Sequence, residues 1–285
     1  MYTRVIGWVF ALLFFAACQN QQKETDNQSE NTDTTKSTTT TTDQLPKPAN
    51  EFIGNIEAAH NKAAFMQKKA VQFDFGLVFG GKEMMKAKLT LLTNSSKGMI
   101  EMANGQKIMF DQSKVFHSAD MENTQGVRFN AYTWSYFFMF PFKLSDAGTQ
   151  WNEYQTDSLS KKDGDSTSQK AYDVQKLTFA GSTGDSPEDW YIVYADKETH
   201  QLDVAAYIVT AGKTKEKAEA DPHAIEYANY EKVDGIPVAT QWIFWGWKAD
   251  KGLTEKIGEA KISNVKFLDV EDSFFKAEGM KEMTK

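Results

Sequence analysis

The sequence is poor in the residues from which metal sites, disulfides and phosphate sites are built. Its 285 residues include one cysteine, Cys18, and four histidines. The rest of the chain can therefore form no internal disulfide and no thiolate-bound metal site, and we expect neither a metal nor a cofactor. Arginine occurs only as Arg4 and Arg128, and the net charge is −7. Because nucleic-acid binding needs clustered cations, nucleic acid is not an expected partner.

Sequence motifs of common enzyme classes are missing as well. The chain contains no G-x-S-x-G, no H-E-x-x-H and no G-x-x-x-x-G-K-[ST]. Glu57 and His60 lie one turn apart on an expected helix, where an interface histidine is the simpler interpretation. Asp185 and Asp189 are expected in a solvated loop and at the start of a strand. We therefore predict a non-catalytic protein, with a hydrolase that uses an unrecognised carboxylate pair as a remaining alternative.

The N-terminus has the pattern of a bacterial lipoprotein signal. Residues 5–17 (VIGWVFALLFFAA) form an uncharged apolar run behind Arg4, too short to span a bilayer. The run ends in FAAC, with small residues directly before Cys18, which resembles a lipobox. We predict a signal peptide at 1–17 and acylation of Cys18, with a plain signal peptide as the alternative. The expected location is the cell envelope, anchored to a membrane through Cys18 and assigned to the outer membrane; the membrane face stays open.

The next segment is too polar to fold. Residues 18–49 consist mainly of Thr, Asn, Gln and Ser, so burial of apolar area cannot offset the conformational entropy lost on folding. We predict a disordered tether with a reach of about 30 Å, estimated from the square root of its length.

The remaining residues, 50–285, have the periodicity of one mainly β domain. Asn50 is an expected N-cap, and apolar residues then recur at spacings of three and four up to Met66. Alternating apolar segments follow, joined by turn signals such as Asn104-Gly105 and Asp234-Gly235. The predicted fold class is α+β: a curled antiparallel sheet of roughly ten strands that forms an incomplete β-barrel, plugged by the N-terminal helix and by a central aromatic helix.

The central helix is expected at residues 133–141, within the segment TWSYFFMFPF, and Pro141 should end it. A helix that is apolar on all sides is buried on all sides, either in a dry core or between the sheet and an apolar cavity. The strand with Trp242, Phe244, Trp245 and Trp247 is a second source of aromatic wall. Its four aromatic residues cannot all share one face without an exposed position or a bulge. The candidate cavity-lining residues are Trp134, Phe137, Phe138, Phe140, Trp242, Phe244 and Arg128.

Arg128 has two interpretations. It can meet the phosphate or carboxylate of a lipid at the cavity mouth. Alternatively, it forms a salt bridge or stacks on Tyr132 or Trp134.

The closing block resembles a known family. The segment YEKVDGIPVATQWIFWGW at 230–247 leads through a DGIP turn into a Trp-bearing strand, and IGEAKISNVKFLDVEDSFF at 257–275 completes the pattern. With the leading helix and the central insertion, this resembles the LolA-like lipoprotein carriers and their acylated partner LolB over about residues 50–275. The resemblance implies an incomplete β-barrel with a helical lid over a hydrophobic cavity that accepts acyl chains.

These observations together favour a membrane-anchored lipoprotein that shelters a lipid, an acyl chain or the lipid part of a lipoprotein. The alternative is an interaction scaffold with a dry core that binds protein or glycan. No particular protein partner is indicated.

Overall fold

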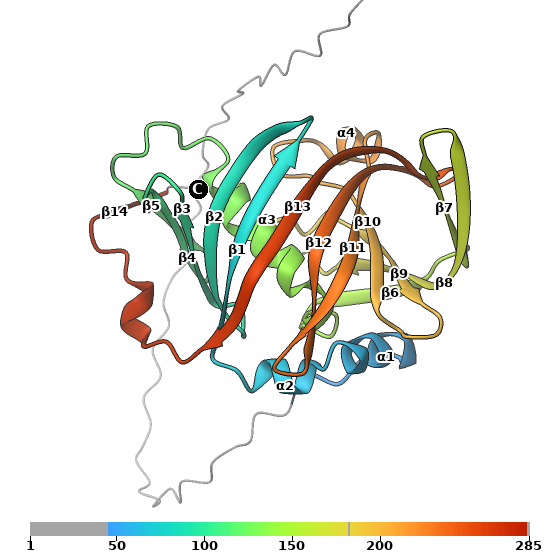
Figure 1. Ribbon diagram of the computed structural model, residues 1–285, viewed down its shortest axis with the longest axis horizontal. Coiled ribbons are helices and arrows are strands. Elements are labelled where there is room, and N and C mark those ends of the chain that lie inside the picture. Colours follow the sequence, from blue (N-terminus) through green and yellow to red (C-terminus); the bar gives the residue numbers. More distant parts are fainter. Residues whose placement is uncertain (1–44, 182, 284–285) are drawn as a thin grey trace, which may run out of the picture. The chain divides into compact units, whose positions relative to one another are not determined.

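A computed structural model describes residues 45–181 and 183–283 of the chain. The predicted signal peptide, Cys18 and nearly all of the predicted tether lie outside the described residues. All helices and strands of the described part lie between Glu51 and Glu282 (Figure 1). Within the described residues, no helix has the length and apolarity needed to cross a membrane.

Two short helices precede the sheet. The α1 helix, Glu51–Ala59, begins at Asn50, whose side chain accepts a hydrogen bond from the backbone N–H of Ile53 at 3.1 Å. This confirms the predicted N-cap. The sequence predicts one continuous helix up to Met66, but Asn61 adopts a left-handed conformation with φ 53° and separates α1 from α2, Lys62–Met66.

One 14-stranded sheet makes up most of the described domain. It is antiparallel throughout except where β7 and β13 meet in parallel at Lys161 and Leu253. Its order is β12-β11-β10-β9-β8-β7-β13-β1-β2-β3-β4-β5-β14, and β6 pairs with β8. The strands are β1 Ala70–Phe79, β2 Lys82–Leu92, β3 Lys97–Met102, β4 Lys107–Asp111, β5 Lys114–Ser118, β6 Thr149–Glu153, β7 Ser158–Asp163, β8 Ser166–Phe179, β9 Tyr191–Asp196, β10 Leu202–Tyr207, β11 His223–Val233, β12 Ile236–Lys248, β13 Gly252–Leu268 and β14 Met280–Glu282.

The predicted fold class is confirmed, although the sheet has more strands than the roughly ten expected. The additional strands are β6, β7 and β14, and β8 also begins earlier than expected. Their sequences, such as SLSKKD in β7 and MKE in β14, lack an alternating apolar pattern. β6 and β14 pair with the second half of β8 and with β5, whereas β7 pairs with the first half of β8, which is as polar as β7 itself. Backbone hydrogen bonds hold these strands in the sheet, so sequence periodicity does not reveal them.

The aromatic segment forms a helix inside the curve of the sheet (Figure 1). The α3 helix, Val127–Met139, is followed by the short 3₁₀ helix η1, Phe140–Phe142. Pro141 lies in η1, so the α-helix ends just before it, as predicted. The helix starts earlier than predicted, directly after Gly126, which has φ 80°.

The opposite, outer face of the sheet carries a second buried cluster. Trp190, Trp245, Trp247 and Tyr194 belong to it, together with Ala218 from the short helix α4, Lys215–Glu219. The register of β12 shifts on both sides of Trp245. Trp242 and Phe244 therefore face α3 while Trp245 and Trp247 face outwards, which is the bulge that the sequence left as one alternative.

The C-terminal segment also packs on the sheet. The 3₁₀ helix η2, Asp272–Phe275, contributes the buried Phe275 to a small cluster with Met99 and Met109.

Candidate functional site

A cavity of about 550 Å³ lies beside α3. One wall is α3 itself. The other walls come from the turn between β4 and β5, the segment between η1 and β6, the loop that follows β8, the start of β9 and the end of β10. Its size falls within the roughly 300–1,000 Å³ of typical small-molecule sites. Thirteen of its 27 lining residues are apolar or aromatic, and the surface of its walls is mainly apolar.

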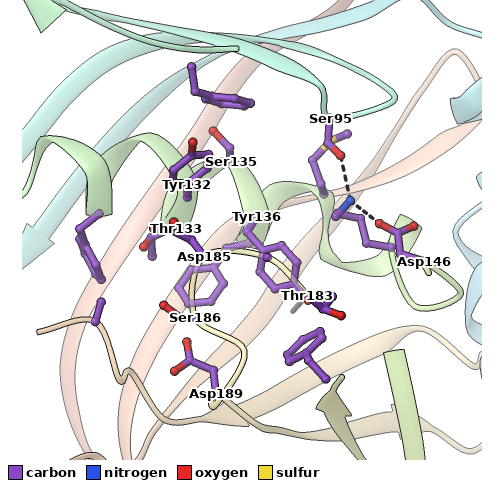
Figure 2. Close-up of a pocket in the computed structure, with 18 of the residues that line it drawn as sticks. Ser95, Tyr132, Thr133, Ser135, Tyr136, Asp146, Thr183, Asp185, Ser186 and Asp189 are labelled. Atoms are coloured by element: carbon purple, nitrogen blue, oxygen red, sulfur yellow. Dashed lines mark hydrogen bonds and ion pairs between the residues drawn. The ribbon is translucent and has the colours of Figure 1, made fainter. Parts of the chain in front are cut away.

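One side of α3 packs against the sheet, and another side lines the cavity. Trp134 and Phe138 face the sheet, where the ring of Phe138 stacks on Phe73 with centroids 4.2 Å apart. Tyr132 and Tyr136, one helical turn apart, line the cavity instead. Figure 2 shows both tyrosines on the helix, with Ser186 and Asp189 on the opposite side of the cavity.

Three tyrosines from three elements meet in the cavity. The rings of Tyr136 on α3 and Tyr191 on β9 lie 5.7 Å apart, and those of Tyr191 and Tyr207 on β10 lie 6.1 Å apart. All three line the cavity. Burial raises the pKa of each of these hydroxyls, so they remain protonated at neutral pH.

Arg128 bridges the cavity at one end. Its Nε donates to Asp185 Oδ2 at 2.9 Å, and its NH1 group donates to the carbonyl of Ser113 at 3.2 Å. The guanidinium also lies 5.1 Å from the ring centroid of Tyr132. Hydrogen bonding to Asp185 raises the pKa of Arg128 further. The structure thus contains both interactions of the alternative interpretation, the salt bridge and the stacking on Tyr132.

The other charged groups of the cavity are Lys143, Asp146 and Asp189. Lys143 Nζ donates to Ser95 Oγ at 2.8 Å and pairs with Asp146 (dashed lines in Figure 2). Asp189 accepts hydrogen bonds from the backbone and hydroxyl of Thr210 through Oδ1, at 2.8 and 2.7 Å. Burial raises the pKa of Asp189.

Comparisons by sequence find nothing: no family model and no curated protein matches the chain. Comparison with solved structures finds a LolA superfamily protein from Nitrosomonas europaea, 12% identical with a TM-score of 0.48, over 78% of this chain and 98% of that one. An outer-membrane lipoprotein-sorting protein domain from Vibrio parahaemolyticus is 11% identical with a TM-score of 0.47, over 80% and 98%. A DUF1329 family protein from Desulfovibrio piger is 13% identical with a TM-score of 0.46, over 80% and 99%.

A curved antiparallel sheet around a helix is the arrangement that the sequence resemblance implied, and it is the arrangement found here. Each of these three solved structures is 11–13% identical to this chain, with a TM-score below 0.5. The similarity concerns the fold alone, so the properties of the site come from this chain's own residues.

Two of the seven predicted cavity residues, Phe137 and Arg128, line the cavity. The other five are buried in the main core and do not line it: Trp134, Phe138, Phe140, Trp242 and Phe244. A void beside Phe138 and Trp242 measures about 10 Å³, which is about the space of one water molecule. As ligand contacts, all seven residues stay predictions.

Several residues of the cavity were not singled out from the sequence. Tyr191 and Tyr207 sit on ordinary alternating strands, and nothing in their spacing separates a cavity wall from a core. Asp185 lies in an exposed loop and Asp189 lies two residues before β9, as the sequence predicts, and both also line the cavity. Asp189 is the first residue of the segment DWYIVYAD, and Asp185 lies four residues before it. Neither position indicates that a helix faces these residues.

Other kinds of site find little support in the described residues. Within 45–181 and 183–283, no group of three or more His, Cys, Asp or Glu side chains is placed to hold a metal ion.

Proposed function

We propose that the cavity beside α3 binds the hydrocarbon chain of a lipid, or the lipid part of a lipoprotein, and does not convert it chemically. The observation that carries this proposal is a cavity of about 550 Å³ whose walls are mainly aromatic and apolar and which opens beside a charged end. The tyrosine rings give it wide apolar surfaces, and Arg128 and Asp185 mark one end.

Apolar burial supplies the driving force. A chain that buries on the order of 300 Å² gains about 7 kcal/mol at about 25 cal/mol per Å². Ordering the chain on binding removes part of this gain.

The proposed setting is the cell envelope. Acylation of Cys18 attaches the protein to a membrane, and the tether of residues 18–49 lets the domain reach lipids or lipoproteins at that membrane. Two or three acyl chains hold such an anchor firmly, while one is marginal.

The test uses the chain from Gln19 onwards, which keeps every buried cluster because all three are formed within the described residues. We expect the purified protein to carry a lipid mass in native mass spectrometry. We also expect the delipidated protein to enhance the fluorescence of N-phenyl-1-naphthylamine.

A pair of matched variants localises this binding. Ala211 and Ala220 are both exposed, but only Ala211 lines the cavity. Ala211→Trp should reduce the uptake of the probe, whereas Ala220→Trp should leave it unchanged. Wild-type protein that carries no lipid and takes up no probe would overturn the proposal and favour the interaction scaffold with a dry core.

A further inference from the structure

We infer that the cavity selects amphiphiles whose polar end is uncharged and accepts hydrogen bonds, such as the ester of a glyceride, over those that end in a carboxylate or phosphate. This inference rests on the proposed function and names the chemistry of the ligand's polar end. It follows from two independent features of the cavity, its free hydroxyl groups and its balance of charge.

The first feature is the set of free hydroxyl groups. Other tyrosines around α3 are tied to backbone carbonyls: Tyr132 to Gln112 at 2.9 Å, Tyr227 to Phe137 at 3.0 Å and Tyr230 to Leu202 at 2.6 Å. Among the described residues, no hydrogen-bond partner is found for the hydroxyls of Tyr136, Tyr191 and Tyr207. Their oxygens are also not among the sealed, unpartnered atoms of the described part, and all three residues line the cavity.

A ligand group that accepts hydrogen bonds would satisfy these hydroxyls. The ring of Tyr191 neighbours those of Tyr136 and Tyr207, and Tyr191 and Tyr207 are direct cross-strand partners, so the three side chains gather between α3 and strands β9 and β10. Because burial keeps the hydroxyls protonated, each can donate. The carbonyl oxygens of an ester are acceptors without a charge, and they suit such a group of donors.

The second feature is charge. Two cationic side chains, Arg128 and Lys143, line the cavity with three acidic ones, Asp146, Asp185 and Asp189, which leaves one net negative charge. Both cations are already paired with carboxylates. In the part of the chain that the structure describes, no cation lies within ion-pair distance of Asp189.

An anionic ligand end would therefore meet no free cation. It would have to displace Asp185 from Arg128 or Asp146 from Lys143, or lie beside the unpaired carboxylate of Asp189. Each choice is unfavourable because like charges at close range in a partly dry site repel. An uncharged ester avoids this repulsion and still reaches the hydroxyls.

The experiment compares two ligands that share the same chain, palmitate and monopalmitoylglycerol, as competitors of N-phenyl-1-naphthylamine at neutral pH. The protein is again the chain from Gln19 onwards. We expect the glyceride to displace the probe at a concentration roughly tenfold lower than palmitate, the factor that corresponds to about 1.4 kcal/mol.

Variants that lack single hydroxyls separate recognition from packing. Tyr136→Phe, Tyr191→Phe and Tyr207→Phe each remove one oxygen and keep the ring. They should weaken the binding of the glyceride several-fold more than that of palmitate, with the affinity of the probe measured separately for each variant. Tyr154→Phe, which lies with the outer cluster, should change neither.

The outcomes distinguish this inference from the proposed function. If the wild type binds the probe but palmitate competes as well as the glyceride, or if the phenylalanine variants bind both ligands like the wild type, the inference is overturned and the proposed function stands. If the wild type binds neither the probe nor any competitor, the proposed function itself fails.

Discussion

The buried aromatic residues of α3 illustrate how residue-level packing divides one helix between core and cavity. Phe138 is 5% exposed and stacks on Phe73, whereas Phe129 is 36% exposed at the cavity wall. Sequence alone groups such residues together, since both are aromatic and lie near the same run.

Phe138 is therefore expected to be a stability residue. Phe138→Ala should lower the free energy of unfolding by about 3–5 kcal/mol, because it removes a buried ring and leaves a cavity. Phe129→Ala is the matched control and should cost less than about 1 kcal/mol. Urea denaturation measures both. Equal, small losses for the two variants would contradict a packed core around Phe138.

His60 provides a second prediction at this scale. It is fully buried, its Nε2 accepts the backbone N–H of Leu202 at 3.0 Å, and burial lowers its pKa from 6.5 to about 3. Below pH 6.5 the unfolded chain binds a proton that the folded protein does not, until the pH approaches 3. Stability should therefore fall as the pH decreases through this window, with a slope approaching about 1.4 kcal/mol per pH unit from this group.

His60→Gln supplies the control, because glutamine offers an acceptor but does not titrate in this range. We expect the pH dependence of the unfolding free energy between pH 6.5 and 3 to be flatter in His60→Gln than in the wild type. Parallel curves for the two proteins would show that His60 is not held neutral. The carboxylates contribute equally to both curves and drop out of the difference.

At the scale of elements, α3 and the main strands can be predicted from their own sequences, but the close contact between strands β7 and β13 cannot. Gly252 begins β13 with φ +70°, and a Cβ there would lie 2.1 Å from the carbonyl oxygen of Ser160 on β7. Gly235, in the turn between β11 and β12, has φ +78° but open space around it. The two glycines thus share a conformation and differ in what surrounds them.

Replacing each glycine by alanine should separate strain from crowding. Gly235→Ala should lower the unfolding free energy by about 1–2 kcal/mol, the usual penalty of a left-handed conformation for a residue with a side chain. Gly252→Ala adds a clash with backbone that cannot move cheaply, so its loss should be clearly larger. Thermal unfolding of the two variants measures the difference, and equal losses would argue against the close crossing of β7 and β13.

At the scale of the whole molecule, the prediction concerns attachment of the protein to a membrane through an acylated Cys18. If Cys18 is acylated, Cys18→Ser should move the protein from the membrane fraction to the soluble fraction and abolish the incorporation of labelled palmitate. Fractionation of the producing cells and metabolic labelling measure these two effects. Neither effect depends on the folded domain, because Cys18 precedes the described residues. A Cys18→Ser variant that stays at the membrane and remains labelled would contradict acylation at this residue.

Local sequence determined a large part of this protein. The alternation of apolar residues predicts the main strands. The aromatic run predicts a buried helix that ends at Pro141, and Asp234-Gly235 predicts a turn. Each of these depends on the conformational preferences of neighbouring residues, which a sequence displays directly. The short polar strands β6, β7 and β14 were missed because their partners, and not their own residues, hold them in the sheet.

Only the tertiary structure decided which aromatic residues fill the core and which leave space. Tyr136, Tyr191 and Tyr207 are far apart in the chain and meet only because β9 and β10 curve around α3, and Asp185 reaches Arg128 only through the loop that follows β8. Hydrophobic burial is not directional, so a sequence shows that these rings leave water but not whether they touch each other or a hollow between them. Whether a ring packs on other rings or lines a cavity depends on the distance between segments that are far apart in the chain, and no local sequence pattern shows this distance.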